Sequence, residues 1–271
     1  MAASDIAAIA AEALASIDAG RQIALFTERH AGFSHADAYA VTAAMRRARL
    51  ARGELTVGRK IGFTNRTIWA EYGADRPMWG YLYSTTVRNL ADVGGTFPLT
   101  GFSEPRIEPE IVFGLASAPR PGLDDASLLE TIAWVAHGFE IVQSIFPRWR
   151  FTIPDTIAAN GLHGALLIGP RVPLAGDTTR WRHELSSFDI DLKCNGAVAD
   201  RGRAANVLDG PLHALRHLVD LLATDTVNPP LAAGEIVTTG TLTRALPVKP
   251  GETWSTVLSG VVLPEISVRF A

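Results

Sequence analysis

The sequence predicts an α+β protein in which a helical segment over residues 1–56 precedes a β-rich region over residues 57–271. The N-terminal segment contains long amphipathic runs rich in Ala and Leu, which are typical of helices. Most of the remainder consists of short β-branched and aromatic runs separated by Gly and Pro, which are typical of strands. Strands and helices do not alternate regularly, and no glycine-rich phosphate-binding motif occurs. We therefore expect one integrated domain without a doubly wound sheet or a nucleotide cofactor.

The composition is that of an ordinary globular chain. Its 271 residues are 47% hydrophobic and 20% charged, with a formal net charge of −3. Because Lys and Arg do not cluster, we expect neither a nucleic-acid partner nor an anionic membrane partner. No apolar run approaches the roughly 20 residues of a membrane helix, the N-terminus lacks the basic start of a signal peptide, and Cys194 has no second cysteine to pair with. A cytoplasmic location is the expectation that follows.

Two helices are predicted in the N-terminal segment. Ser4 is expected to cap the first, whose apolar residues recur at helical spacing until Gly20 ends it. The second is expected to begin at Ser34, where Asp37 completes a capping box, and to continue almost to Gly53.

The β-rich region is expected to contain one tight hairpin and two further helices. Asn195-Gly196 predicts a two-residue turn, since both positions must tolerate positive φ. Helical spacing of apolar residues predicts helices over residues 124–138 and 211–223. The strand-like runs are TVGRKIGF, YLYSTTV, RIEPEIVFGL, FEIVQSIF, ALLIG, FDIDLKCN, EIVTTG and PEISVRF.

Two glutamates share one face of a predicted strand over residues 106–113. Strand alternation points Glu108 and Glu110 the same way, so their repulsion must be relieved by protonation or by a hard cation. The same pattern also fits an ordinary half-exposed strand, and Pro109 predicts an edge strand or a bulge. Glu140, expected just after the helix that ends at residue 138, supplies a third carboxylate. Three such ligands would suit Mg²⁺ or Mn²⁺.

Seven motifs carry a resemblance to a known family. They are GRKIGFT, RPMWGYLY, RIEPEIVF, FEIV, PDTIAAN, AGEIVTTGTLTRALPVKPGE and PEISVRF. In order and spacing, from about residue 57 to residue 270, they resemble the 2-oxopent-4-enoate hydratase/4-oxalocrotonate decarboxylase family of the fumarylacetoacetate hydrolase superfamily. The resemblance implies a mixed β-roll with a divalent metal at its mouth, a helical N-terminal segment and a homo-oligomer. It places the metal ligands on Glu108, Glu110 and Glu140, and the family's lysine on Lys60, which would anchor the substrate or move a proton.

Further polar residues are expected to contact the substrate. Asn160 matches a family position, and the glycine turn containing Thr239 and Thr241 is where the superfamily contacts the substrate carboxylate, although threonines are also ordinary turn residues. Arg148 is a candidate partner for a distal carboxylate, or else a solvated surface arginine. His163, next to this segment, is either functional or a hydrogen-bonded structural histidine.

The predicted function is that of a metal-dependent lyase of aromatic-compound degradation, acting on a small 2-oxo or 2-hydroxydienoic acid. Hydration is placed ahead of decarboxylation. Met78, Ala159 and Leu162 stand where relatives carry acids and a hydroxyl, so the set of proton carriers is thinner than usual. For that reason two alternatives stay open: a hydrolase that cleaves a carbon–carbon bond of an acylpyruvate, and a pseudoenzyme that binds metal and ligand without turnover.

Overall fold

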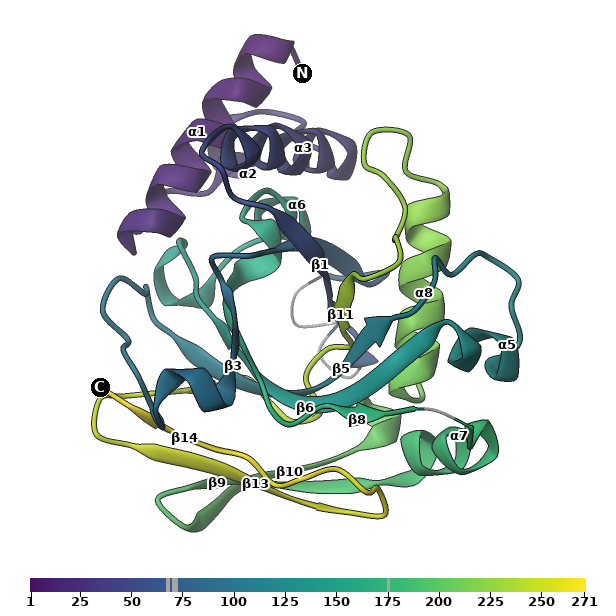
Figure 1. Cartoon of the computed structure of the whole chain (residues 1–271). Coiled ribbons are helices and arrows are strands. Elements are labelled where there is room, and N and C mark those ends of the chain that lie inside the picture. Colours follow the sequence, from purple (N-terminus) through teal and green to yellow (C-terminus); the bar gives the residue numbers. More distant parts are fainter. Residues whose placement is uncertain (67–68, 70–72, 175) are drawn as a thin grey trace.

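The chain folds as two sheets with helices on the outside. The structure, a computed structural model, describes residues 1–66, 69, 73–174 and 176–271. A curled nine-stranded sheet forms the centre, α1 and α3 lie together at one end of the molecule, and a five-stranded sheet lies at the opposite end (Figure 1). Every helix among the described residues is too short or too polar to span a bilayer.

The N-terminal helices pack onto the larger sheet's end through apolar faces. They are α1 (Ala3–Ala19), α2 (Phe26–Arg29) and α3 (His35–Ala51). The predicted capping box at Ser34 is confirmed: its Oγ accepts a hydrogen bond from Asp37 N at 3.2 Å. Ser4 does not cap α1, because the helix starts at Ala3. The apolar faces of α1 and α3 share one core cluster with Met78 and Val142 of the β region.

The larger sheet is mixed. Its strands β1 and β11 run parallel, as do β3 and β7, whereas all other neighbours are antiparallel. The spatial order is β2 (Met78–Tyr83), β1 (Thr56–Gly62), β11 (Ile236–Thr238), β5 (Arg106–Leu115), β6 (Ile132–Val142), β7 (His163–Ile168) and β3 (Val87–Asn89), with β12 (Leu246–Pro247) added to β5 and β8 (Val172–Pro173) to β6.

The smaller sheet contains the predicted hairpin. Asn195 and Gly196 both have positive φ, 50° and 84°, and Cys194 pairs with Ala197 across the turn, which confirms the hairpin. The two sheets meet through an apolar layer that includes Phe139 of β6 and Trp254 of β13. The strand order is β10 (Ala197–Arg203), β9 (Asp189–Cys194), β13 (Thr253–Ser259), β14 (Ser267–Phe270) and β4 (Thr96–Phe97).

Of the two helices predicted in the β region, one is right and one is wrong. Residues 211–223 form α8 (Pro211–Ala223). The run 124–138 instead divides into α5 (Asp125–Glu130) and β6. Ladders with β5 on one side and β7 on the other satisfy the β6 backbone, so tertiary pairing overrides the helical spacing of its apolar residues. Further helical elements among the described residues are α6 (Ile153–Ala158), α7 (Thr178–Ser187), η2 (Leu90–Val93), η3 (Pro147–Trp149), η4 (Asn160–Leu162) and η5 (Ala204–Asn206).

Pro109 lies in a central strand, so the prediction of an edge strand or a bulge at this residue is wrong. Its carbonyl accepts a hydrogen bond from Leu242 N at 3.0 Å, which places its own nitrogen on the same side of β5. That side faces the segment between β11 and β12, where the regular ladder of β5 is interrupted after Val112 and resumes at Ile107. A missing N–H donor is tolerated there.

Candidate metal centre and active site

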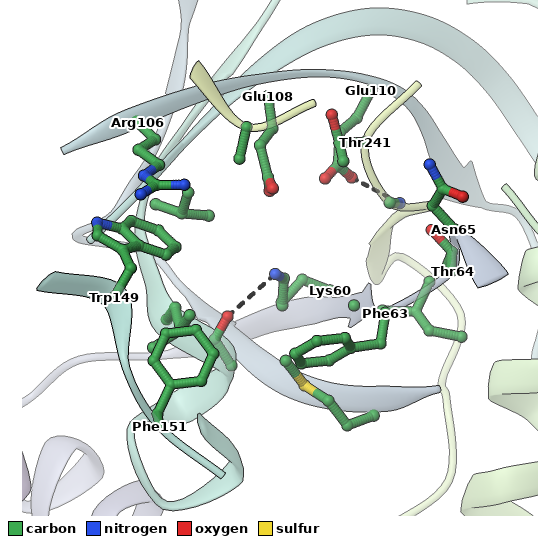
Figure 2. Close-up of a pocket in the computed structure, with 18 residues that line it drawn as sticks. Lys60, Phe63, Thr64, Asn65, Arg106, Glu108, Glu110, Trp149, Phe151 and Thr241 are labelled. Carbon is green, nitrogen blue, oxygen red and sulfur yellow. Dashed lines mark hydrogen bonds between the residues drawn. The ribbon is translucent and has the colours of Figure 1, made fainter. Parts of the chain in front are cut away.

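Three glutamates meet where β5 and β6 lie side by side. Glu108 and Glu140 are cross-strand partners, and Glu110 lies two residues along β5 opposite Gly138. One carboxylate oxygen from each of the three residues lies within 4.8 Å of the others. Glu110 and Glu140 are fully buried, whereas Glu108 is partly exposed. Figure 2 shows Glu108 and Glu110 reaching from one side into a pocket, as strand alternation predicts.

The two buried carboxylates, Glu110 and Glu140, have different polar partners. Glu110 accepts a hydrogen bond from Gly240 N at 2.8 Å through Oε2, but its buried Oε1 has no hydrogen-bond partner among the described residues. Glu140 Oε1 lies 2.8 Å from His163 Nδ1, whereas its Oε2 makes no hydrogen bond among the described residues and is 3.3 Å from Lys60 Nζ, an ion pair. The orphaned oxygen of Glu110 is the atom that most clearly lacks a cation or a donor.

The electrostatics of the cluster show an uncompensated negative charge. Burial, with the neighbouring carboxylates, raises the pKa of Glu108 to about 7 and raises the pKa of Glu110 well above its usual range. Burial also opposes ionisation of Glu140, but the ammonium of Lys60 and the His163 hydrogen bond outweigh it and lower its pKa. Burial opposes the charge on Lys60 too, and the three glutamates raise its pKa.

A divalent cation fits this donor set. Three ionised carboxylates and one ammonium leave a buried excess of negative charge that one Mg²⁺ or Mn²⁺ would neutralise. All the donors are carboxylate oxygens, which hard cations prefer. The free Oε1 of Glu110 offers a ligand position that needs no rearrangement of an existing hydrogen bond.

Lys60 lines the same pocket and is fixed by a strained turn. Its Nζ donates a hydrogen bond to the Gly161 carbonyl at 3.0 Å. Asn160, Gly161 and Leu162 all have positive φ, and a Cβ on Gly161 would lie 2.8 Å from Lys60 Cδ. The amide of Asn160 bonds to both backbone groups of Tyr81, at 2.8 and 2.9 Å, and does not line the pocket. Asn160 therefore holds the turn that orients Lys60.

The glycine turn after β11 closes another wall of the pocket. Thr241 lines the pocket, and its Oγ1 donates to Thr243 O at 3.0 Å. The hydroxyl of Thr239 is instead buried against Ile111 O at 3.0 Å, away from the pocket. Gly240 has φ of 92°, and a Cβ there would lie 1.9 Å from Thr64 Oγ1, so no larger residue fits. The two threonines predicted as equivalent thus have different environments.

Arg148 lies outside this pocket, and Arg106 lies inside it. Arg148 lines a neighbouring surface groove, where its backbone N–H donates to Glu104 Oε1 at 3.2 Å. Arg106 lines the pocket, and its guanidinium carbon lies 4.0 Å from the centroid of the Trp149 ring (Figure 2). The sequence analysis missed Arg106, although it lies two residues before Glu108 in the same alternating strand, which is the signal that could have found it.

The other walls are mainly apolar. Met78 and Leu162, two of the three departures from the family pattern, line the pocket, whereas Ala159 belongs to the core beneath the N-terminal helices. Polar groups on the remaining wall come from Thr64 and Asn65. The further apolar residues of the pocket are Ile61, Phe63, Val142, Trp149, Phe151 and Ala245.

Behind Glu140, His163 forms a short hydrogen-bonded chain. Its Nδ1 faces Glu140 Oε1, and its Nε2 lies 2.8 Å from Thr86 Oγ1. Asp155, another residue of the family pattern, is used elsewhere: its carboxylate accepts hydrogen bonds from Thr27 and Thr152 and so fastens α2 to α6. His163 therefore fixes a carboxylate of the cluster, and Asp155 supports the scaffold.

Known proteins are similar to this chain over most of its length. The model of the family described as fumarylacetoacetate (FAA) hydrolase C-terminal matches residues 67–266. A 2-hydroxyhexa-2,4-dienoate hydratase of Comamonas testosteroni is 30% identical over 247 residues, which cover 91% of this chain and 90% of the relative. The 2-keto-4-pentenoate hydratase 1 of Dechloromonas aromatica (strain RCB) is 31% identical over 254 residues, covering 93% and 92% of the two chains.

A solved structure is similar over the whole chain. It is that of 4-oxalocrotonate decarboxylase from Pseudomonas putida G7, complexed with magnesium and adipate. The TM-score is 0.89 at 25% sequence identity, and the match covers 100% of this chain and 99% of that one. The likeness therefore includes the N-terminal helices as well as both sheets.

Proposed function

Since the chain belongs to the fumarylacetoacetate hydrolase family, we propose that the pocket around Lys60, Glu108, Glu110 and Glu140 is its active site and that its substrate is a small 2-oxo or 2-hydroxydienoic acid. The family resemblance, the α+β β-roll and the class of divalent-metal-dependent lyase, all predicted from the sequence, are confirmed. The observation that carries the proposal is the buried cluster of three carboxylates whose charge one lysine does not balance.

Glu108, Glu110 and Glu140 would hold the metal through one oxygen each. When bound, a divalent cation would supply a Lewis acid that stabilises the negative charge that develops on the substrate's enol oxygen. The rest of the chemistry falls to residues of the chain, which must bind the substrate, place water and carry protons.

Lys60 is the proposed proton carrier. Its ammonium is held by the Gly161 carbonyl and by Glu140 at the floor of the pocket. The three glutamates keep its pKa high while their charge is uncompensated. Once that charge is neutralised, burial becomes the dominant influence and lowers the pKa of Lys60 towards the range in which it can exchange a proton.

Hydration of a 2-hydroxydienoic acid is the first candidate reaction. Water must add to one carbon of the terminal double bond while the other carbon gains a proton, so one group must orient the water. Thr64, Asn65 and Thr241 offer hydroxyl and amide groups on one wall, within the same pocket as Lys60. These neutral groups would take the place of the acid and the hydroxyl that relatives carry at the positions of Met78 and Leu162.

Decarboxylation of a 2-oxo dicarboxylic acid is the second candidate. It needs no water, and one proton transfer completes it after CO₂ has left. The similarity in fold to a decarboxylase over the full chain and the presence of a cation, Arg106, in the pocket favour it.

One assay tests both reactions. The protein is incubated with Mg²⁺ and 2-hydroxypenta-2,4-dienoate, oxalocrotonate or an acylpyruvate, while dienol absorbance and CO₂ release are followed. We expect turnover of at least one of the first two substrates and its loss with a chelator. Turnover of the acylpyruvate alone would mean a hydrolase, and ligand binding without any turnover would mean a pseudoenzyme.

We also propose a cytoplasmic homo-oligomer whose partners are small molecules. The unpaired Cys194 suits a reducing compartment, and the net charge of −3 gives no attraction to nucleic acid. Light scattering of the purified protein measures the oligomeric state, and a monomeric mass at working concentration would contradict this proposal.

A further inference from the structure

Arg106 occupies an unusual position beside the glutamates. Because Arg106, Glu108 and Glu110 alternate along β5, one strand face delivers a cation and two acids to the same pocket. Figure 2 shows Arg106 and Trp149 on one side of the pocket and Thr64 and Asn65 on the other. The guanidinium carbon lies 4.0 Å from the centroid of the Trp149 ring, a cation–π contact that positions the group without using its N–H donors.

Arg106 forms no ion pair with a carboxylate in the described part of the chain. Its guanidinium lies over the Trp149 ring, and its charge acts on Glu108 only from beyond ion-pair distance, where it lowers the pKa of that carboxyl. Arg59, a buried arginine of β1, shows how an arginine inside a protein is usually neutralised: it forms an ion pair with Glu235 at 3.1 Å. A guanidinium held in a pocket without an ion-pair partner of its own is suited to receive a carboxylate from a ligand.

The surface outside Arg106 favours the same type of ligand. Arg106 and Trp149 separate the pocket from the adjoining surface groove, which also contains Arg148 and Lys249. Glu104 is the single acid among the residues that line this groove. The approach to Arg106 therefore carries excess positive charge, which attracts a dianion.

The two ends of the pocket thus suit the two ends of one molecule. Strand geometry places the Cα of Arg106 about 7 Å from that of Glu108, and both side chains reach into the same pocket, so one short molecule can contact the guanidinium and the carboxylate cluster together. Apolar side chains of Val142, Trp149 and Leu162 line the pocket as well. We propose that Arg106 is a specificity-determining residue that binds the distal carboxylate of a dicarboxylic 2-oxo acid, and so selects such substrates over those ending in a methyl or vinyl group.

The role of Arg106 rests on the proposed function, and it predicts that loss of this side chain changes KM and not kcat. Arg106 meets the substrate at the end remote from the developing enol charge, so its contribution is expected to be equal in the ground state and the transition state. Loss of such an interaction raises KM and leaves kcat nearly unchanged. If the distal carboxylate is the group that leaves as CO₂, the arginine stabilises the charge before it leaves, which is a second reason why its removal should not lower kcat.

The test compares a dicarboxylate with a matched monocarboxylate. Binding of adipate and of hexanoate to the protein in the presence of Mg²⁺ is measured by calorimetry for the wild type and Arg106→Met. Adipate affinity should fall on the order of 30-fold in the variant, as for loss of a desolvated ion pair, and hexanoate affinity should change by less than about 3-fold. The KM values of a dicarboxylic and a monocarboxylic substrate should follow the same pattern.

Two further variants control for folding and for general charge. Arg106→Lys keeps the charge and should recover part of the adipate affinity, and Arg120→Met removes an exposed charge that lines neither the pocket nor the groove and should cost little. Equal loss for both ligands, or no loss for either, would overturn the assignment of Arg106. Absence of turnover by the wild type would instead overturn the proposed function, while the calorimetric comparison would still decide the role of Arg106.

Discussion

The two ends of the pocket are built in different ways. At the inner end, Lys60 and the three glutamates lie on β1, β5 and β6, strands whose backbones are paired within the nine-stranded sheet. At the outer end, Arg106 begins β5, but the aromatic rings lie outside regular strands: Phe63 follows β1, Trp149 ends η3 and Phe151 follows it. The difference indicates that the sheet fixes the charged groups of the pocket, whereas loops supply the apolar rings that shape its entrance.

The two ends also differ in electrostatics. The inner end gathers two buried carboxylates and one partly exposed carboxylate around one ammonium, so removal of any one charge changes the pKa of the others. The outer end consists of apolar rings and a single guanidinium. Substitutions at the inner end should therefore change metal affinity and kcat, and substitutions at the outer end should change KM.

The largest effect is expected from Glu110→Gln. The change preserves shape and the acceptor for Gly240 N, but it removes a ligand charge beside the orphaned oxygen. We expect kcat/KM to fall on the order of 1000-fold, with Mg²⁺ affinity, measured by calorimetry, falling as well. Glu130→Gln, at an exposed site at the end of α5, is the matched control. Wild-type Mg²⁺ affinity in Glu110→Gln would contradict the metal site.

Lys60→Met should separate catalysis from metal binding. The ammonium lies 3.3 Å from Glu140 Oε2 and competes with a metal for that oxygen. Its removal should lower kcat on the order of 100-fold, as for loss of a general acid or base, while Mg²⁺ affinity stays equal or increases. Parallel measurement of kcat and Mg²⁺ affinity checks this. A variant that loses metal affinity together with activity would show that Lys60 supports the site instead of carrying protons.

His163→Gln should have an intermediate effect. The imidazole holds Glu140 Oε1 at 2.8 Å and is itself held by Thr86. Loss of such a partner behind a metal ligand typically costs about 10- to 100-fold in metal affinity or activity. Titration with Mg²⁺ measures the loss, and Thr86→Val should show a smaller loss in the same direction. An unchanged titration in both variants would mean that Glu140 is oriented by the strand alone.

The scaffold behind the glutamates should be sensitive to pH. Burial lowers the pKa of His137 to about 4, against about 6.5 when unfolded. The unfolded chain then binds the proton first, so this contribution to stability is fully present above about pH 6.5 and is lost as the pH falls to about 4. The difference between the two pKa values corresponds to at most about 3 kcal/mol of stability. In the folded protein, the His137 ring nitrogens contact Glu110 O and Thr256 Oγ1, both at 3.1 Å.

Urea unfolding of His137→Gln at pH 7.5, 5.5 and 4.5 checks this contribution. As the pH is lowered, the free energy of unfolding should decrease less steeply in the variant than in the wild type. His35→Gln, at an exposed position, is the control and should keep the wild-type slope. Parallel slopes in all three proteins would show that His137 is not the titrating group.

The parts of the inner end that sequence could predict are those set by local rules. Strand alternation placed Glu108 and Glu110 together, and a capping box and an Asn-Gly turn set the bounds of a helix and a hairpin. Glu140 was assigned to the correct cluster through the resemblance, although its strand was predicted to start too late. The register that pairs it with Glu108 depends on ladders with two distant strands, which spacing alone does not contain.

The outer end could not be predicted in the same way. Arg148 was predicted to meet a distal carboxylate, and its position in the groove could not be foreseen because the sequence does not show which way a loop side chain points. Arg148 and Trp149 both have positive φ, at 61° and 56°, and this local backbone conformation accompanies a ring that faces the pocket and an arginine that faces the groove. The direction of the Asn160 side chain could not be predicted either: its amide forms hydrogen bonds with the backbone of Tyr81 and does not reach the pocket.

The smallest effect is expected from Phe151→Leu, which tests whether the ends are separable. The Phe151 ring lies against Trp149, with centroids 6.0 Å apart, and Trp149 in turn supports Arg106. Leucine keeps the wall apolar but removes ring area, so KM should rise about 3- to 10-fold through lost apolar contact, with kcat nearly unchanged. Steady-state kinetics with saturating Mg²⁺ measures both. A fall in kcat as large as that of Lys60→Met would mean that the loop end controls the chemistry as well, and the division between sheet and loop would have to be abandoned.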